Sequence, residues 1–326
     1  MTSAPLRPDR LVWDNHACMP LRPDAAFLPQ LERYRAGGVD VVSLNLVFDS
    51  LPWTLGIQVA ATMRDWLARH ADRYVLAGTT REIREAKAAG KLAIVFDVEG
   101  MSALDGRVEM VRLYHDLGVR WMLIAYNAHN AAGGGCIEAD DPGLSPFGRD
   151  VLAAMKEVGM VVCCSHTGLR TTRDVFECAG NPVILSHSNP RALCDHPRNV
   201  PDEIIDACAA TGGVVGIVGF GLFLAGGDVG AENVARTIDY AVQRVGPEHV
   251  GFSTDYVFDF TELDDFLVTF RKRFPTAFPE GGSIGMVAPE DFPRLAEALS
   301  NLGYPDSVIG AILGGNWMRV AEQVWK

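Results

Sequence analysis

Two short apolar runs near the middle of the chain each lead into the dipeptide Ser-His, and this repeat constrains the fold more than any other feature. The runs are MVVCC and PVILS, and they end at His166 and His187. Short runs rich in Val and Ile are typical of buried strands. Between them, TTRDVFECAG has helical spacing and ends at Gly180, a residue type that often closes a helix. The stretch predicts a strand–helix–strand unit with a histidine at the carboxyl end of each strand.

The two histidines are candidates for a shared metal site. Parallel strands in barrels and open sheets gather functional side chains at their carboxyl ends. A single histidine at such an end is more often a hydrogen-bonded structural residue. Its repetition in two neighbouring strands favours two imidazoles that hold the same ion.

The rest of the chain alternates between strand-like and helix-like patterns. Eight apolar runs predict buried strands at 11–16, 39–46, 91–100, 119–127, 160–164, 182–186, 214–220 and 249–255. Helical spacing lies between consecutive runs, and two more helices are expected at 292–302 and 305–324. This alternation predicts an α/β protein, a (β/α)8 TIM barrel, and we expect residues 1–326 to form one domain.

Chemically versatile side chains fall at the ends of these predicted strands. They are His16, Glu99, His166, His187 and Asp255. In a closed barrel, strand ends that are distant in sequence converge on one mouth. Histidine and carboxylate ligands suit zinc or a similar divalent ion, and a pair of such ions can activate water. We therefore expect a hydrolytic metal site in which Asp255 transfers the proton of the attacking water.

Arg198 follows His187 by eleven residues, in the segment HPRNVPD. Its planar fork of N–H donors suits a substrate carboxylate. An arginine taken in isolation is more often an exposed surface residue. Its assignment to the site therefore depends on the surrounding motifs.

The composition excludes several classes of function. With 48% hydrophobic residues the chain can bury a large core, and its net charge of −12 argues against nucleic-acid binding. The first residues lack the pattern of a secretory signal, and the longest apolar run, 214–224, is too short to span a bilayer. We expect a cytoplasmic protein without a membrane anchor, whose seven cysteines are thiols.

Several ordered motifs together resemble the membrane dipeptidase family, the renal dipeptidase-like peptidases of family M19. The resemblance covers most of the chain and rests on DNHACMP, DVEGM, LGVRWMLIAYNAHN, GLSPFGRDVLAAMKEVGM, SHT, SHSNPRALCDHPRNVPD, TGGVVGI, GFSTD and GGNWMRV. It implies a (β/α)8 barrel of the metallo-dependent hydrolase type. The implied activity is zinc-dependent hydrolysis of dipeptides, often with tolerance for a C-terminal D-residue.

The resemblance also implies roles for individual residues. His16 would bind the first of two zinc ions, Glu99 would bridge both, and His166 and His187 would hold the second. Arg198 would receive the substrate carboxylate.

The same resemblance makes Asp255 the proton-transfer group, beside Glu99 among the catalytic residues. Tyr126 and Asn127 correspond to the family's substrate-binding His-Asn pair.

Three positions depart from the family pattern. Cys18 stands where an aspartate normally follows the first histidine, so it is either a thiolate ligand or a buried thiol, and one zinc ion remains an alternative to two. Tyr126 replaces a histidine; its hydroxyl can donate to an oxyanion, and His129 is a candidate substitute. Cys163 replaces an aspartate expected to orient a metal ligand.

These departures leave other functions open. The first alternative is an amidohydrolase that cleaves another small amide bearing a carboxylate. The second is a catalytically weakened barrel that binds a ligand. For partners, we expect a small dipeptide substrate and no nucleic acid, and a homodimer is compatible with the sequence.

Overall fold

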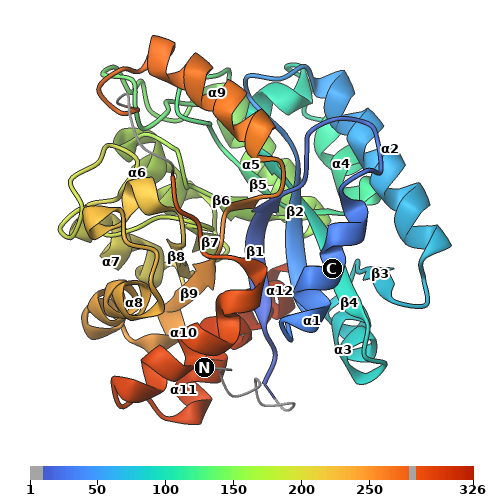
Figure 1. Cartoon of the computed structure of the whole chain (residues 1–326). Helices are drawn as coiled ribbons and strands as arrows, with labels where there is room; N and C mark the ends of the chain where they lie inside the picture. Colours follow the sequence, from blue (N-terminus) through green and yellow to red (C-terminus); the bar gives the residue numbers. More distant parts are fainter. Residues whose placement is uncertain (1–9, 279–283) are drawn as a thin grey trace.

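The computed structural model describes residues 10–278 and 284–326, and at its centre eight parallel strands form a ring (Figure 1). Around the ring they follow the order of the chain: β1 (Trp13–Cys18), β2 (Val41–Phe48), β4 (Leu92–Glu99), β5 (Val119–Leu123), β6 (Val161–Cys163), β7 (Val183–Ile184), β8 (Val215–Val218) and β9 (Val250–Ser253). A parallel bridge between Leu185 and Val215 joins β7 to β8. The ring closes where the Asp255 N–H donates to the carbonyl of His16. This confirms the predicted (β/α)8 barrel.

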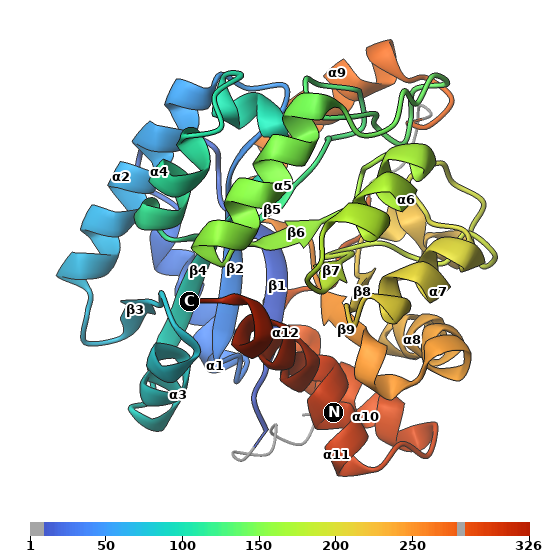
Figure 2. The same ribbon diagram turned by 180° about the vertical axis from the view of Figure 1, so that it is seen from behind.

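Helices surround the ring on its outer side (Figures 1 and 2). In chain order they are α1 (Glu32–Ala36), α2 (Trp53–Arg69), α3 (Thr80–Ala88), α4 (Met110–Leu117), α5 (Pro146–Val158), α6 (Leu169–Cys178), α7 (Asp202–Ala210), α8 (Ala231–Val245), α9 (Phe260–Arg273), α10 (Phe292–Asn301), α11 (Asp306–Gly310) and α12 (Asn316–Val324). Local signals set several ends. Ser145 caps α5 by accepting a hydrogen bond from the Gly148 N–H, as its position predicts.

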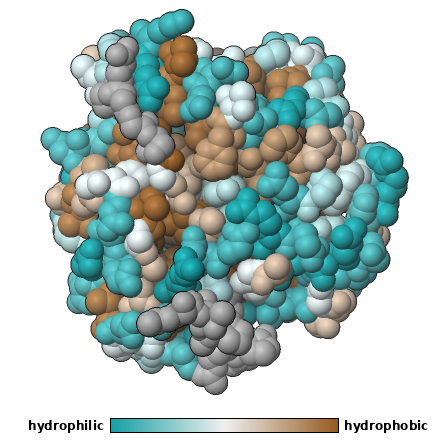
Figure 3. Space-filling model, viewed as in Figure 1, coloured by the Kyte–Doolittle hydropathy of each residue, from teal (hydrophilic) through white to brown (hydrophobic). Residues whose placement is uncertain are grey.

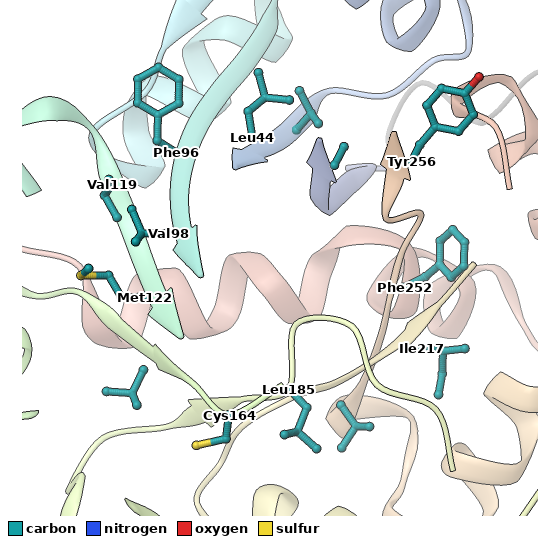
Figure 4. Packing of buried hydrophobic residues seen from close by; sticks show 14 of the residues in the cluster. Leu44, Phe96, Val98, Val119, Met122, Cys164, Leu185, Ile217, Phe252 and Tyr256 are labelled. Atoms are coloured by element: carbon teal, nitrogen blue, oxygen red, sulfur yellow. The ribbon is translucent and has the colours of Figure 1, made fainter. Parts of the chain in front are cut away.

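Strand side chains alternate between two apolar clusters. In β4, Phe96 and Val98 face the helices, whereas Val95 faces the barrel interior. The outward-facing side chains follow one another around the ring in Figure 4. The interior cluster also contains Trp317 of α12, so this helix packs against one end of the barrel. The opposite end, where the strands finish, is the mouth.

Three parts of the structure differ from the sequence expectation. Strand β3 (Tyr74–Leu76) pairs with β4 outside the ring, and β10 (Tyr256–Val257) pairs with β1. Helix α9 has no counterpart in the predicted elements, although TELDDFLVTFRKR has helical spacing. The single helix expected at 305–324 contains a π-helical turn at Ala311–Gly315.

The structure also shows the state of the cysteines and the lengths of the helices. All seven cysteines are free thiols, and Cys163 and Cys164 lie in opposite apolar clusters. Among the described residues, every helix is too short or too polar to cross a membrane. The sequence EGGSIGMVAPED at 280–291 predicts a loop, which falls partly on residues 279–283, outside the described part of the chain.

Candidate metal centre and substrate pocket

Three imidazoles converge on one carboxylate oxygen at the mouth of the barrel. Glu99 Oε1 lies 3.5 Å from His16 Nε2, 3.5 Å from His166 Nε2 and 3.3 Å from His187 Nε2. The Nε2 atoms of His166 and His187 are 2.8 Å apart. Oε1 is buried and accepts no hydrogen bond from the described residues. The strand ends thus assemble the four residues that the sequence assigned to a metal.

The opposite ring nitrogens are already engaged. His16 Nδ1 lies 3.3 Å from Asp97 Oδ2, and His166 Nδ1 lies 2.8 Å from Asn127 Oδ1. With Nδ1 donating to an oxygen, a neutral imidazole presents a lone pair at Nε2. These contacts therefore orient the His16 and His166 rings so that their Nε2 atoms point toward Glu99.

Burial and neighbouring charges shift the pKa values of this cluster in different directions. Burial, together with the positive charge of Arg198, lowers the pKa of His166 well below its usual value, and burial likewise lowers the pKa of His187. Burial works in the same direction on His16, but the carboxylates of Glu99 and Asp97 outweigh it and raise the pKa of His16 well above its usual value. Burial raises the pKa of Glu99 to about 8, although His16 and Arg198 oppose the shift. Imidazoles around a buried carboxylate oxygen that has no donor among the described residues form the donor set of a zinc-type site, and a bound cation would displace the protons of His16 and Glu99. The residues present therefore fit a divalent metal ion.

A second group of ligand atoms adjoins the first. His16 Nε2 lies 3.5 Å from Asp255 Oδ1 and 3.7 Å from Cys18 Sγ. Ligand atoms of His16, Cys18 and Asp255 all fall within 4.8 Å of one another, as do those of His16, Glu99 and His187. The Cys18 side chain therefore faces the cluster. Burial raises the pKa of this thiol to about 12, so it is protonated unless a cation lies beside it.

Backbone strain is concentrated at this site. Of the described residues, the non-glycine positions with positive φ are Asn127 (63°), His166 (60°), Asp255 (53°) and Asp105 (50°). The first three belong to the cluster or its hydrogen-bond partners. Neighbouring backbone holds them: the Cys136 N–H donates to the His166 carbonyl at 2.8 Å. Such conformations cost about 1–3 kcal/mol each and gather where function requires an orientation.

Asp49 is a positioning residue that the sequence analysis missed. Its carboxylate accepts from the N–H groups of Tyr126 (2.9 Å) and Ser102 (2.8 Å) and from the Asn130 amide (2.8 Å). Its own N–H donates to the Glu99 carbonyl at 2.9 Å. It thus ties together the loops after β2, β4 and β5. Its only sequence signal was its place just after a strand.

Asp14 performs a similar task on the other side of the mouth. Its carboxylate accepts from the Thr254 N–H (2.9 Å) and hydroxyl (2.5 Å) and from the Tyr34 hydroxyl (2.8 Å). Because Thr254 precedes Asp255, these bonds hold the candidate proton-transfer carboxylate against β1. Burial raises the pKa of Asp14 to about 6, and the hydrogen bonds from Thr254 and Tyr34 limit that shift.

Arg198 is buried, with 2% of its surface exposed, rather than on the surface. Its guanidinium donates to the His187 carbonyl at 2.7 Å and to Ser188 Oγ at 3.2 Å. Its Nε–H has no partner, and the guanidinium lies 5.5 Å from the centre of the Phe223 ring. None of the described carboxylates forms an ion pair with it. A buried cation in this state favours an anionic ligand.

The remaining predicted residues divide into two groups. The Tyr126 ring stacks on His166 with centroids 4.2 Å apart, and Asn127 holds His166 as described above. By contrast, His129 is largely exposed and pairs with Glu138, away from the metal cluster. The structure therefore gives it no place in the pocket.

The position where the family pattern led us to expect an orienting carboxylate holds the Cys163 thiol, and the Ser186 hydroxyl lies between this thiol and His187. Cys163 Sγ lies 3.1 Å from Ser186 Oγ, which lies 2.6 Å from His187 Nδ1. The orientation of His187 thus depends on a neutral group, whereas that of His16 depends on Asp97.

An apolar pocket lies directly over the cluster and is covered by α9. Besides metal-site residues, its wall consists mainly of aromatic and aliphatic side chains: Met19, Leu21, Phe48, Phe220, Phe223, Val257, Leu263, Phe266, Leu267, Phe270 and Phe278. Apolar surface also gathers over and beside α9 in the upper part of Figure 3. The pocket has a polar floor and an apolar roof, the combination typical of sites for small ligands.

Comparison with known proteins agrees with this geometry. A family model described as membrane dipeptidase (peptidase family M19) matches residues 30–267. Dipeptidase aclJ of Aspergillus oryzae is 30% identical over 243 residues, which are 72% of this chain and 52% of that protein. The match thus spans about half of the relative.

Solved structures extend the likeness over almost the whole chain. An amidohydrolase from Pseudomonas aeruginosa superimposes with a TM-score of 0.89 at 29% identity, covering 98% of this chain and 97% of that one. A metallo peptidase from Rhodobacter sphaeroides, liganded with a phosphinate mimic of the dipeptide L-Ala-D-Ala, gives a TM-score of 0.77 at 20% identity, covering 97% and 100%. The second shows likeness of fold alone. The family match over residues 30–267 establishes that the chain belongs to the membrane dipeptidase family, peptidase family M19.

Proposed function

We propose that this protein is a metal-dependent dipeptidase of the binuclear zinc type. The observation that carries the proposal is the juxtaposition of the imidazole–carboxylate cluster with a buried guanidinium that forms no ion pair with a carboxylate of residues 10–278 or 284–326. A dipeptide with a free carboxyl end presents an anion at a short distance from its amide bond. The guanidinium would bind the anion, and the imidazole–carboxylate cluster would act at the amide bond. Family membership and the names of the relatives support the same activity.

The ligand atoms form two overlapping groups. His166, His187 and Glu99 would hold one ion, and His16, Cys18 and Asp255 surround the other position. Glu99 Oε1 is close to all three imidazoles, so Glu99 would be a ligand common to both groups. Zinc bound there would supply an acidic water and would polarise the peptide carbonyl.

The chain's own residues would bind the substrate and move its protons. Arg198 would orient the dipeptide through its carboxylate, and the apolar roof would exclude bulk water. Asp255, which lies beside His16 Nε2 and is partly exposed to the pocket, would take the proton of the attacking water and deliver it to the leaving nitrogen. Burial raises the pKa of Tyr126 well above its usual value, so its hydroxyl keeps its proton and can donate to the developing oxyanion.

The activity is tested by removing and restoring the metal. Protein treated with a chelator should lose dipeptide hydrolysis, and stoichiometric zinc should restore it, with metal content measured on the same samples. Free dipeptides should be cleaved with higher kcat/KM than N-acetylated amino acids. A reversed order would favour an amidohydrolase acting on other amides, and metal-loaded protein that cleaves neither class would contradict the proposal.

A second prediction concerns Cys18. If its thiol is a ligand, metal should deprotonate it and protect it from iodoacetamide, and Cys18→Ala should lose one of two ions. Cys18→Asp should keep both ions, because the carboxylate replaces the thiolate. The measurement is metal content with and without each substitution. An equal content in the wild type and in Cys18→Ala would rule the ligand role out.

A further inference from the structure

The roof of the pocket contains a continuous cluster of aromatic rings, of which the proposed chemistry uses only the Tyr126 hydroxyl. Phe48 lies 4.9 Å from Tyr126, 5.1 Å from Phe266 and 6.3 Å from Phe270, measured between ring centroids. Tyr126 in turn stacks on His166. The cluster, which we call the aromatic roof, comprises Phe48, Tyr126, Phe266 and Phe270. It therefore begins at the metal cluster and extends to α9.

The order of the strands places Phe48, the β2 end of this roof, opposite Arg198. Arg198 is bonded to the residues that follow β7, whereas Phe48 ends β2. Three strands separate β2 from β7 in each direction around the ring, so their ends face each other across the mouth. The metal cluster lies between them. A dipeptide whose carboxylate binds Arg198 and whose amide lies at the cluster must extend its N-terminal residue toward the aromatic roof.

The four rings of the aromatic roof carry no charge, so this wall favours uncharged N-terminal side chains of the substrate. Glu262 is the acid that α9 contributes to the pocket: its Oε1 accepts from the Leu21 N–H at 2.9 Å, and its Oε2 lies 3.9 Å from Arg22 Nη1 and accepts no hydrogen bond from the described residues. An aspartate side chain would lose hydration against the four rings without gaining a partner. An aromatic side chain would instead gain apolar burial and ring contacts.

We propose that the aromatic roof is a specificity subsite for a large apolar side chain, and that the preferred substrates are dipeptides with an aromatic N-terminal residue. This inference rests on the proposed dipeptidase function for its orientation of the substrate. It concerns binding, so it can be tested without turnover.

The test is isothermal titration of metal-replete protein with three phosphinate mimics, of Phe-Ala, Ala-Ala and Ala-Phe. The Phe-Ala mimic should bind at least about tenfold more tightly than the Ala-Ala mimic, and the Ala-Phe mimic should gain less. Equal affinities, a larger gain for Ala-Phe, or binding of none of them would overturn the inference.

Hydrolysis of the matching dipeptides separates this inference from the proposed function. Tighter binding of the Phe-Ala mimic without hydrolysis would sustain the subsite and refute the dipeptidase. Hydrolysis of all three dipeptides with equal binding of their mimics would support the dipeptidase and refute the subsite.

Matched substitutions on α9 locate the subsite. Phe270→Ala should reduce the affinity ratio of the Phe-Ala and Ala-Ala mimics to about one, because it removes a ring from the roof. Phe260→Ala is the control on the same helix, since its side chain is 52% exposed and lies outside the pocket. An equal reduction in both variants would contradict the assignment. Should Phe270→Ala fail to fold, Phe48→Leu tests the same roof. It should likewise reduce the affinity ratio of the Phe-Ala and Ala-Ala mimics to about one.

Discussion

Replacing His187 with alanine is expected to abolish metal binding and dipeptide hydrolysis together. The substitution removes the Nε2 atom that lies 3.3 Å from Glu99 Oε1 and 2.8 Å from His166 Nε2. The remaining atoms then present an incomplete ligand set around a buried carboxylate. Loss of one electrostatic contributor to a reaction costs about 10²–10³ in kcat, so a decrease of at least that size is expected. Elemental analysis and kcat/KM on the same preparation measure both effects.

The control for this experiment is His129→Ala, which removes an exposed histidine paired with Glu138. It should keep its full metal content and its activity. Retention of stoichiometric metal in His187→Ala, with the fold intact by circular dichroism, would exclude His187 from the metal site.

Replacing Arg198 with alanine is expected to raise KM strongly for dipeptides with a free carboxyl end. A charge-assisted hydrogen bond contributes about 1.5–3 kcal/mol, which corresponds to roughly tenfold to a hundredfold in KM. C-terminally amidated dipeptides lack the anion and should be much less affected. The comparison of KM for the two substrate forms is the measurement.

Metal content separates substrate binding from a structural role, because Arg198 also donates to the His187 carbonyl. Arg198→Ala should keep its metal, and Arg173→Ala, which disrupts a surface ion pair with Glu203, should change neither KM nor metal. Equal effects of Arg198→Ala on free and amidated substrates would refute the carboxylate assignment.

Most of the barrel was predictable from local patterns. A strand that is buried on both faces must be almost wholly apolar, so β2 and β4 are visible as continuous runs of hydrophobic residues. The strands β3 and β10 were not predictable, because runs of three and two residues carry too little pattern. Helix α9 was missed although its spacing is helical. Its importance comes from its position over the pocket, which the helical spacing alone does not reveal.

Only part of the candidate site was predictable from the sequence. The Ser-His repeat and the carboxylates at strand ends could be identified because parallel strands carry functional groups at their carboxyl ends. Asp49 and Asp14 could not be identified in this way, because their importance lies in hydrogen-bond donors that are 20 to 240 residues distant in sequence. The aromatic roof likewise combines rings from β2, the loop after β5, and α9.

The sequence by itself determined the barrel, the set of candidate metal ligands and the likeness to the membrane dipeptidase family. These properties follow from the periodicity of buried strands and from short motifs, which are local in the chain. Only the tertiary structure decided that Arg198 is buried without an ion pair to any described carboxylate and that the Cys18 side chain faces His16. It also decided that Phe48 of the aromatic roof lies across the mouth from the guanidinium. Those facts depend on which strand ends face each other across the mouth, and closure of the ring fixes that arrangement.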